Sequence, residues 1–215
     1  MAVAPGAAAA AVATGLAFGP GVLSGGHGAS VASAPTAGEY TTKAGVFGKL
    51  LPAGTGKISE VSLMRMVKQV PKAPLSKPVG PYDGDYAVVR PDGIGYITVH
   101  VATRTEIAAK TGGKGLENPC KDAPKDGRVG CTTQKLSDGS LLGVWETPAS
   151  DPALHPTPAW GREFTAVLVL KDGRALRVRD STGYQGEGQL GRLLKTPPLT
   201  RDQLTKPIQN PALRP

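Results

Sequence analysis

Three Asp-Gly dipeptides punctuate stretches of alternating apolar and polar residues in this chain: Asp92-Gly93, Asp138-Gly139 and Asp172-Gly173. Asp-Gly readily supplies the positive φ angles that two-residue hairpin turns require. Each dipeptide therefore predicts two antiparallel strands joined by a tight turn. The predicted pairs are 86–89 with 95–103, 134–136 with 141–146, and 164–170 with 174–179. These turns limit the chain to a fold built mainly on an antiparallel sheet.

The alternation along these stretches predicts which side chains share a face of the sheet. On 95–103, Ile97 and Val99 point to one side and His100 to the other. On 174–179, Leu176 and Val178 face away from the neighbouring basic residues. The stretch 57–70 also shows period two and is predicted as a further strand. The proline-rich stretches 70–80 and 151–160 are predicted as loops.

Helices are expected at the two ends of the folded part. Thr36 and Glu39 have capping-box spacing, and the residues that follow place an apolar stripe on one face of a helix. Thr200 and Gln203 repeat that spacing near the C-terminus, where Pro207 is expected to stop or kink the helix. The predicted fold class is α+β, with an antiparallel sheet of about five or six strands between a short N-terminal and a short C-terminal helix.

The beginning of the chain has a different composition. Its first charged residue is Glu39, and 1–35 is rich in Ala, Gly and Val. Its apolar run approaches the roughly 20 residues of a bilayer-spanning helix, which favours a membrane anchor. The alternatives are a secretory signal peptide, against which Pro35 and the missing basic start argue, and a disordered tail. Under the first two alternatives, 36–215 is a single extracytoplasmic domain. A cluster of Lys and Arg residues upstream of Met1 would supply the basic start that a signal peptide needs.

Cys120 and Cys131 are the two cysteines of the chain, and a polar, turn-rich segment separates them. In an oxidising compartment this pattern predicts a disulfide. Such a bridge would contribute about 3 kcal/mol to stability. Zinc binding would need further ligands nearby, and a redox pair would favour Cys-x-x-Cys. We therefore expect the disulfide only if the chain is exported. A paired Cys120 and Cys131 would in turn support export.

The net charge of +8 arises from 25 Lys and Arg against 17 Asp and Glu. All of these follow the uncharged start, so the folded part is basic. Attraction to an anionic cell-wall polymer or to lipid headgroups would follow outside a membrane. The basic residues are scattered among acids, however, as on an ordinary solvated surface. Nucleic-acid-binding motifs of the common kinds are absent, and we expect no nucleic-acid partner.

No constellation in the sequence identifies a catalytic, cofactor-binding or metal-ligating residue. The stretch 51–58 approaches a P-loop but has Leu51 in place of the first glycine and Ile58 in place of the hydroxyl residue. A serine triad would need His100 or His155 as its base, and no Gly-x-Ser-x-Gly elbow is present. The glycine-rich loop 183–188 is interpreted as a solvated connector. Glu146, Glu163 and Glu187 are interpreted as background acids.

Several segments resemble a family of uncharacterised, membrane-anchored or exported proteins of actinobacteria, streptomycetes in particular. The resemblance rests on the apolar start, on 50–56, on Cys120 and Cys131 ahead of an Asp-Gly turn, and on the ending 197–200 with 203–204 and 210–211. It covers most of 36–215, while Lys206-Pro207 departs from the longer terminal helix expected. It implies an extracytoplasmic domain, in some members a partner of sigma-factor regulators, and brings no catalytic residue with it.

The sequence therefore favours a non-catalytic extracytoplasmic domain with a binding, sensory or accessory role. The expected partners are the membrane, through the N-terminal segment, and a protein or an anionic cell-wall polymer. The alternatives are a small secreted hydrolase, which requires His100 or His155 to meet a carboxylate and a hydroxyl in one cleft, and a regulator that partners a sigma-factor signalling system.

Overall fold

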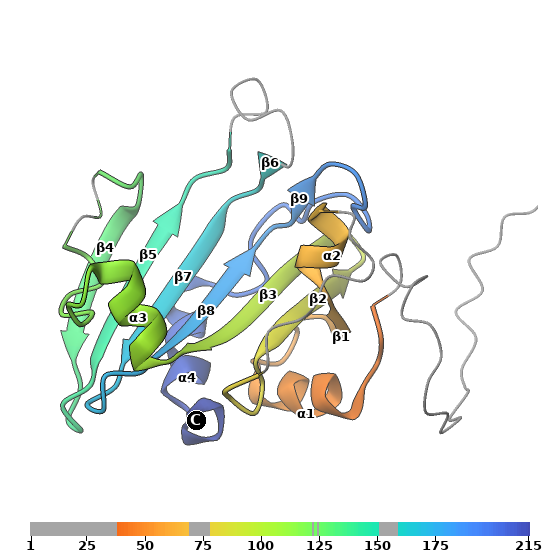
Figure 1. Ribbon diagram of the computed structural model, residues 1–215. Helices are drawn as coiled ribbons and strands as arrows, with labels where there is room; N and C mark the ends of the chain where they lie inside the picture. The colour runs from red at the N-terminus through yellow and green to blue at the C-terminus, as the bar shows by residue number, and fades with distance from the viewer. Residues whose placement is uncertain (1–37, 69–77, 122, 124, 151–158) are drawn as a thin grey trace, which may run out of the picture. The chain divides into compact units, whose positions relative to one another are not determined.

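The computed structural model describes residues 38–68, 78–121, 123, 125–150 and 159–215. It is an α+β fold in which seven antiparallel strands form one sheet in the order β1-β2-β3-β8-β7-β5-β4 (Figure 1). All the described elements belong to the unit Val31–Pro215. The predicted fold class is confirmed, with more strands in the sheet than the five or six expected.

The strands of this sheet are β1 (Lys57–Val61), β2 (Gly84–Arg90), β3 (Gly93–Ala102), β4 (Val129–Lys135), β5 (Leu141–Thr147), β7 (Glu163–Val169) and β8 (Ala175–Ser181). Two short strands, β6 (Ala159–Trp160) and β9 (Tyr184–Gln185), pair separately. The helices are α1 (Thr42–Leu50), α2 (Leu63–Lys68), α3 (Arg104–Thr111) and α4 (Arg201–Gln209), and a 3-10 turn, η2 (Pro211–Leu213), follows α4.

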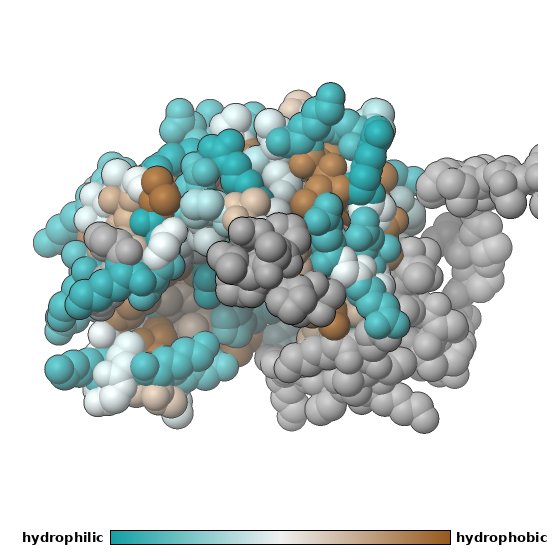
Figure 2. Space-filling model, turned by 90° about the horizontal axis from the view of Figure 1, so that it is seen from above, coloured by the Kyte–Doolittle hydropathy of each residue, from teal (hydrophilic) through white to brown (hydrophobic). Residues whose placement is uncertain are grey.

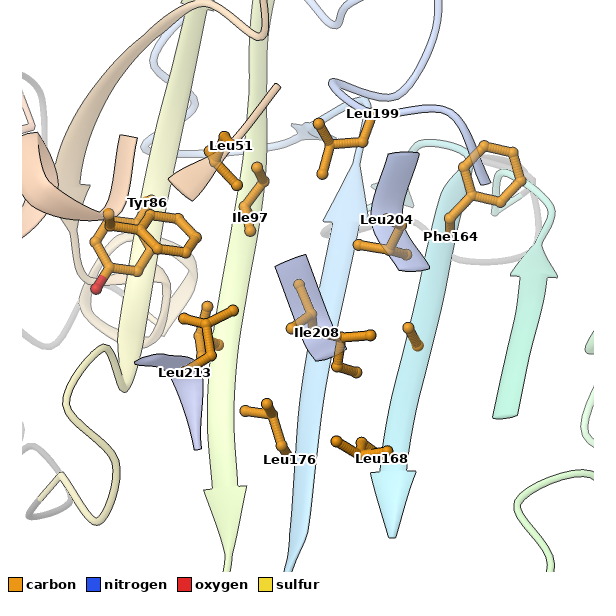
Figure 3. Packing of buried hydrophobic residues seen from close by; sticks show 14 of the residues in the cluster. Leu51, Tyr86, Ile97, Phe164, Leu168, Leu176, Leu199, Leu204, Ile208 and Leu213 are labelled. Carbon is orange, nitrogen blue, oxygen red and sulfur yellow. The ribbon is translucent and has the colours of Figure 1, made fainter. Parts of the chain in front are cut away.

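The main hydrophobic core lies on the face of the sheet that α1 and α4 cover, which we call the inner face. Leu204 and Ile208 of α4 and Leu213 of η2 are fully or almost fully buried, and Figure 3 shows them against Leu168 and Leu176 of the central strands. Alternate residues of β2, β3, β5, β7 and β8 reach this core, as the period-two pattern predicts. The inner face is therefore closed by helices from both ends of the described chain.

The opposite face, which we call the outer face, is covered only at its two sides. A small cluster around Leu63 and Met66 packs α2 against Tyr96 and Tyr184. A second cluster packs Ile107 of α3 against Trp145 and its neighbours on the sheet. Figure 1 shows α2 and α3 on the near side of the sheet and α4 behind it. Polar and charged side chains occupy the outer face between these two clusters.

The turns carry the Asp-Gly dipeptides in two different ways. Between β4 and β5, and again between β7 and β8, a backbone bond closes a three-residue loop whose last residue is Gly139 or Gly173, each with φ of 81°. Such loops combine a type I turn with a glycine bulge, so they differ from the two-residue turns expected. Between β2 and β3 the two connecting residues are Pro91 and Asp92, and Gly93 already pairs with Arg90.

The predicted strand over 57–70 is wrong in its second half. The strand β1 ends at Val61, and α2 begins two residues later. The carboxylate of Asp85 accepts a hydrogen bond from the backbone N–H of Leu63 at 2.9 Å, which satisfies one of the free donors at the start of this helix. The last two residues of the prediction, 69 and 70, lie outside the described residues.

Both predicted terminal helices are present, with changes at their boundaries. Thr41, not Thr36, caps α1, and Glu39 is extended and bridges Glu60. Residue 36 lies outside the described part. At the C-terminus, Thr200 and Gln203 form the predicted capping box. The helix α4 continues two residues beyond Pro207, although a stop or kink was expected there.

Cys120 and Cys131 form a disulfide with their Cα atoms 5.7 Å apart. Cys131 lies on β4 and packs at the edge of the Ile107 and Trp145 cluster. The bridge therefore fastens the loop before β4 to the outer face. In the described part of the chain, no helix has both the length and the apolar character to cross a membrane. The predicted anchor 1–35 falls outside that part.

Candidate functional site

A row of five side chains crosses the outer face on adjacent strands. Asp85 of β2 stands opposite Thr98 of β3, and Thr98 stands opposite Arg179 of β8. The row continues through Thr165 of β7 to Trp145 of β5. Residues directly opposite one another in antiparallel strands have Cβ atoms about 5 Å apart, so neighbours in the row are within reach of each other. Hydrogen-bond donors and acceptors thus meet in one row on the outer face, where Thr165 and Trp145 are buried.

Arg179 is the central charged residue of this row. Its Nη2 lies 2.5 Å from Oε2 of Glu163, whose side chain is only 11% exposed. The guanidinium carbon also lies 5.2 Å from the centre of the Trp160 ring. The Nε atom of Arg179 is buried, and none of the described residues forms a hydrogen bond with it. The guanidinium is therefore held in place by its other contacts while one of its donors stays unsatisfied.

Asp85 supports the other side of the row. One carboxylate oxygen accepts from the backbone N–H of Leu63, and the other accepts from the hydroxyl of Thr98 at 3.0 Å. Burial raises the pKa of Asp85, while these hydrogen bonds and the charge of Arg179 act in the opposite direction. Both carboxylate oxygens are engaged, so Asp85 mainly positions α2 and Thr98.

A cleft of about 290 Å³ opens between α2 and Trp160. Three polar residues of the row line it, and the rest of its lining is apolar. The lining residues are Leu63, Met64, Val67, Asp85, Thr98, Trp160 and Arg179. A mostly apolar cleft with a few convergent polar groups is the typical form of a small-molecule site.

More positive charge lies next to the row. Arg177 stands opposite His100, one step along β8 from Arg179. Arg177 is exposed, yet partial desolvation of its guanidinium by neighbouring groups, followed by the charge of Arg179, lowers its pKa. The guanidinium of Arg128 lies 5.0 Å from the centre of the Trp145 ring and is ion-paired with Asp126 at 2.6 Å. Three arginines thus share the outer face, where Asp85, Glu163 and Asp126 supply negative charge.

The surface seen from above is largely hydrophilic, and hydrophobic residues gather in a few separate places (Figure 2). In the described part of the chain, no group of three His, Cys, Asp or Glu side chains is placed to hold a metal ion.

The structure places the candidate catalytic residues apart from one another. His100 lies on the outer face, and among the described residues no carboxylate or hydroxyl is hydrogen-bonded to it; His155 lies outside those residues. Glu146 forms two hydrogen bonds with Arg162, at 2.7 and 2.8 Å, and these lower the pKa of Glu146. The constellation that a serine-type hydrolase would need is not formed by the described residues.

Two interpretations from the sequence need correction. The loop 183–188 is more than a solvated connector, because Tyr184 is buried and pairs with Trp160 in the small sheet. Glu163 is more than a background acid, because it is buried and ion-paired with Arg179. The alternation along 174–179 predicted that its basic residues share one face of the sheet. Nothing in that pattern indicated that Asp85 would lie in the same row.

No protein-family model, curated protein or solved structure matches this chain.

Proposed function

We propose that the chain is an exported, non-catalytic domain that binds a protein or an anionic wall component on the outer face of its sheet. The observation that carries this proposal is the uneven covering of the two faces. The inner face is closed by α1 and α4, whereas the middle of the outer face presents Arg177 and Arg179 beside an apolar cleft. Charged groups on an otherwise rigid sheet are suited to recognition.

Export is supported by the disulfide and by the uncharged start. Disulfides persist in oxidising compartments and are rare in the cytosol of most organisms. Cys120 and Cys131 are paired, and the described chain has no free cysteine. In this proposal 1–35 attaches the domain to the membrane or directs its secretion.

Export is tested by expressing the full chain with its native start in a bacterial host and separating the cell fractions. We expect the protein in the membrane or external fraction, with both thiols unreactive toward an alkylating agent until a reductant is added. Cytosolic protein with two reactive thiols would contradict export and the disulfide together.

Binding is tested by sedimentation of the full chain with purified bacterial cell walls. Arg177→Glu reverses an exposed charge on the outer face and should lower the bound fraction several-fold. Lys49→Glu makes the same charge change at an exposed position of α1, away from that face, and serves as the matched control. Equal losses in both variants would indicate attraction to net charge alone and would contradict a binding face.

A further inference from the structure

We propose that the cleft between α2 and Trp160 binds a small carboxylate that carries an apolar body. The inference rests on the proposed function and adds the chemical class of the ligand. It is carried by the apolar lining of the cleft, by a buried donor of Arg179 that has no partner among the described residues, and by the charges around this arginine.

The apolar body of the ligand would contact Leu63, Met64 and Val67 of α2 together with Trp160. The backbone N–H of Leu63 donates a hydrogen bond to Asp85, which holds this end of α2 at the cleft. The volume of about 290 Å³ is just below the ~300–1,000 Å³ typical of ligand pockets. It therefore suits a short alkyl chain or a single branched side chain better than a polymer.

The carboxylate would meet Arg179, the cationic residue that lines the cleft. Nε of Arg179 is buried and has no hydrogen-bond partner among the described residues. Buried polar groups in native proteins are nearly always paired, so this unsatisfied donor requires an explanation. An oxygen acceptor bound against Arg179 would supply its partner.

The charges around Arg179 favour an anionic acceptor. Arg179 and Arg128 both lie close enough to Arg177 to lower its pKa, and His100 stands opposite Arg177. On the negative side, Arg128 is paired with Asp126, and Glu163 holds a single edge of the Arg179 guanidinium. Asp85 has both oxygens engaged by Leu63 and Thr98. Arg179 therefore retains donors for an incoming carboxylate, whose charge-assisted hydrogen bonds are the stronger kind.

Trp145 and Trp160 are the two tryptophans of the chain, so the cleft can carry its own reporter. In a Trp145→Phe variant, all tryptophan fluorescence comes from Trp160 in the cleft. The probes are octanoate and N-acetyl-leucine, which represent a free alkanoic acid and a peptide end. Their neutral controls are octanamide and N-acetyl-leucinamide.

We expect at least one of the two acids to change the Trp160 signal with saturation. Its amide should bind about tenfold more weakly, a loss that corresponds to about 1.4 kcal/mol. The acid that binds more tightly identifies the source of the ligand. If an acid and its amide bound equally, the ligand would not be recognised by its carboxylate. If neither acid changed the Trp160 fluorescence, the inference as a whole would be wrong.

Two variants of the apolar lining locate the ligand. Met64→Glu and Val67→Glu each place a negative charge there and should abolish binding. Val46→Glu, on the exposed side of α1, is the control. Unaltered affinity in both Met64→Glu and Val67→Glu would place the acid elsewhere and overturn the site.

The two proposals fail separately. If cell walls still sediment the protein in an Arg177-dependent way but neither acid binds, the ligand class is wrong and the binding face stands. If the acids bind at Trp160 and walls do not sediment the protein, the wall component is wrong and the cleft stands. Loss of both results would overturn both.

Discussion

Asp180 on β8 accepts a hydrogen bond from the backbone N–H of Leu199 at 2.9 Å, and both residues are buried. This bond ties the segment before α4 to a central strand of the sheet. The second carboxylate oxygen of Asp180 is buried without a partner. Burial raises the pKa of Asp180 well above its ordinary value of 3.8, although the Leu199 hydrogen bond and the charge of Arg90 oppose this.

The first prediction concerns the pH dependence of stability. Because its pKa is higher in the folded state, Asp180 holds its proton after the unfolded chain has lost it, so its contribution to stability falls as the pH rises above about 3.8. The free energy of unfolding of Asp180→Asn, relative to the wild type, should therefore increase from pH 3 to pH 7. Urea titrations across this range measure it.

Asp172→Asn is the control with the opposite sign. Hydrogen bonds from Arg174 lower the pKa of Asp172, so this carboxylate stabilises the fold above its unfolded pKa, and that contribution is lost as the pH falls. Relative to the wild type, Asp172→Asn should lose stability as the pH rises. Parallel trends in both variants would contradict the burial of Asp180.

The second prediction concerns the disulfide. Replacing Cys120 and Cys131 by serine frees a loop with a sequence separation of 11 residues, and the loop-entropy relation gives a loss of about 3 kcal/mol. Urea denaturation of the double variant should show this loss. The reduced wild type should be destabilised by a similar amount, and an unchanged midpoint in both would show that the bridge does not constrain the unfolded chain.

The third prediction compares two alanine substitutions of apolar residues. Leu204 of α4 is fully buried against the inner face, so Leu204→Ala should cost about 2–5 kcal/mol of unfolding free energy. Val129 at the start of β4 is 52% exposed, and Val129→Ala should change stability by roughly 0.5 kcal/mol or less. Thermal denaturation of the two variants would contradict the assignment of the core if their losses were alike.

The fourth prediction assigns opposite signs to the same change at two glycines. A Cβ atom at Gly45 in α1 meets nothing within 4 Å, so Gly45→Ala should stabilise the helix by about 0.5–1 kcal/mol. A Cβ atom at Gly95 in β3 would lie 2.6 Å from the carbonyl oxygen of Ser181, so Gly95→Ala should destabilise by about 1–3 kcal/mol. Differential scanning calorimetry should show the two melting temperatures on either side of the wild type.

Local signals predicted most of the elements. The capping box of α4 was found from Thr200 and Gln203, and the same reasoning applies to Thr103 and Glu106, whose capping box begins α3. The sequence pattern did not predict α3, because the alternation of the preceding strand extends to Thr103, the residue that caps the helix. The helix α2 is harder to predict, since its start is stabilised by Asp85, which lies on β2, 22 residues after Leu63 in the chain.

The candidate site was beyond prediction because it depends on strand order. Asp85 and Arg179 are far apart in the sequence, and they share a row only because β8 lies beside β3 in the sheet. Hairpin signals identify pairs of neighbouring strands and leave the order of the pairs open. The alternation within β8 was enough to predict which face the arginines occupy. Their neighbours on the adjacent strands follow only from the register in the structure.

The strand β4 forms one edge of the sheet, and most of its residues are exposed. Its register shifts between Val129 and Thr132, which leaves only four regularly paired residues, and Cys131 within this bulge is bonded to Cys120. Short, bulged edges are poor templates for a strand from another molecule. Because the disulfide holds this edge in its bulged form, we expect it also to hinder aggregation through edge-to-edge strand pairing.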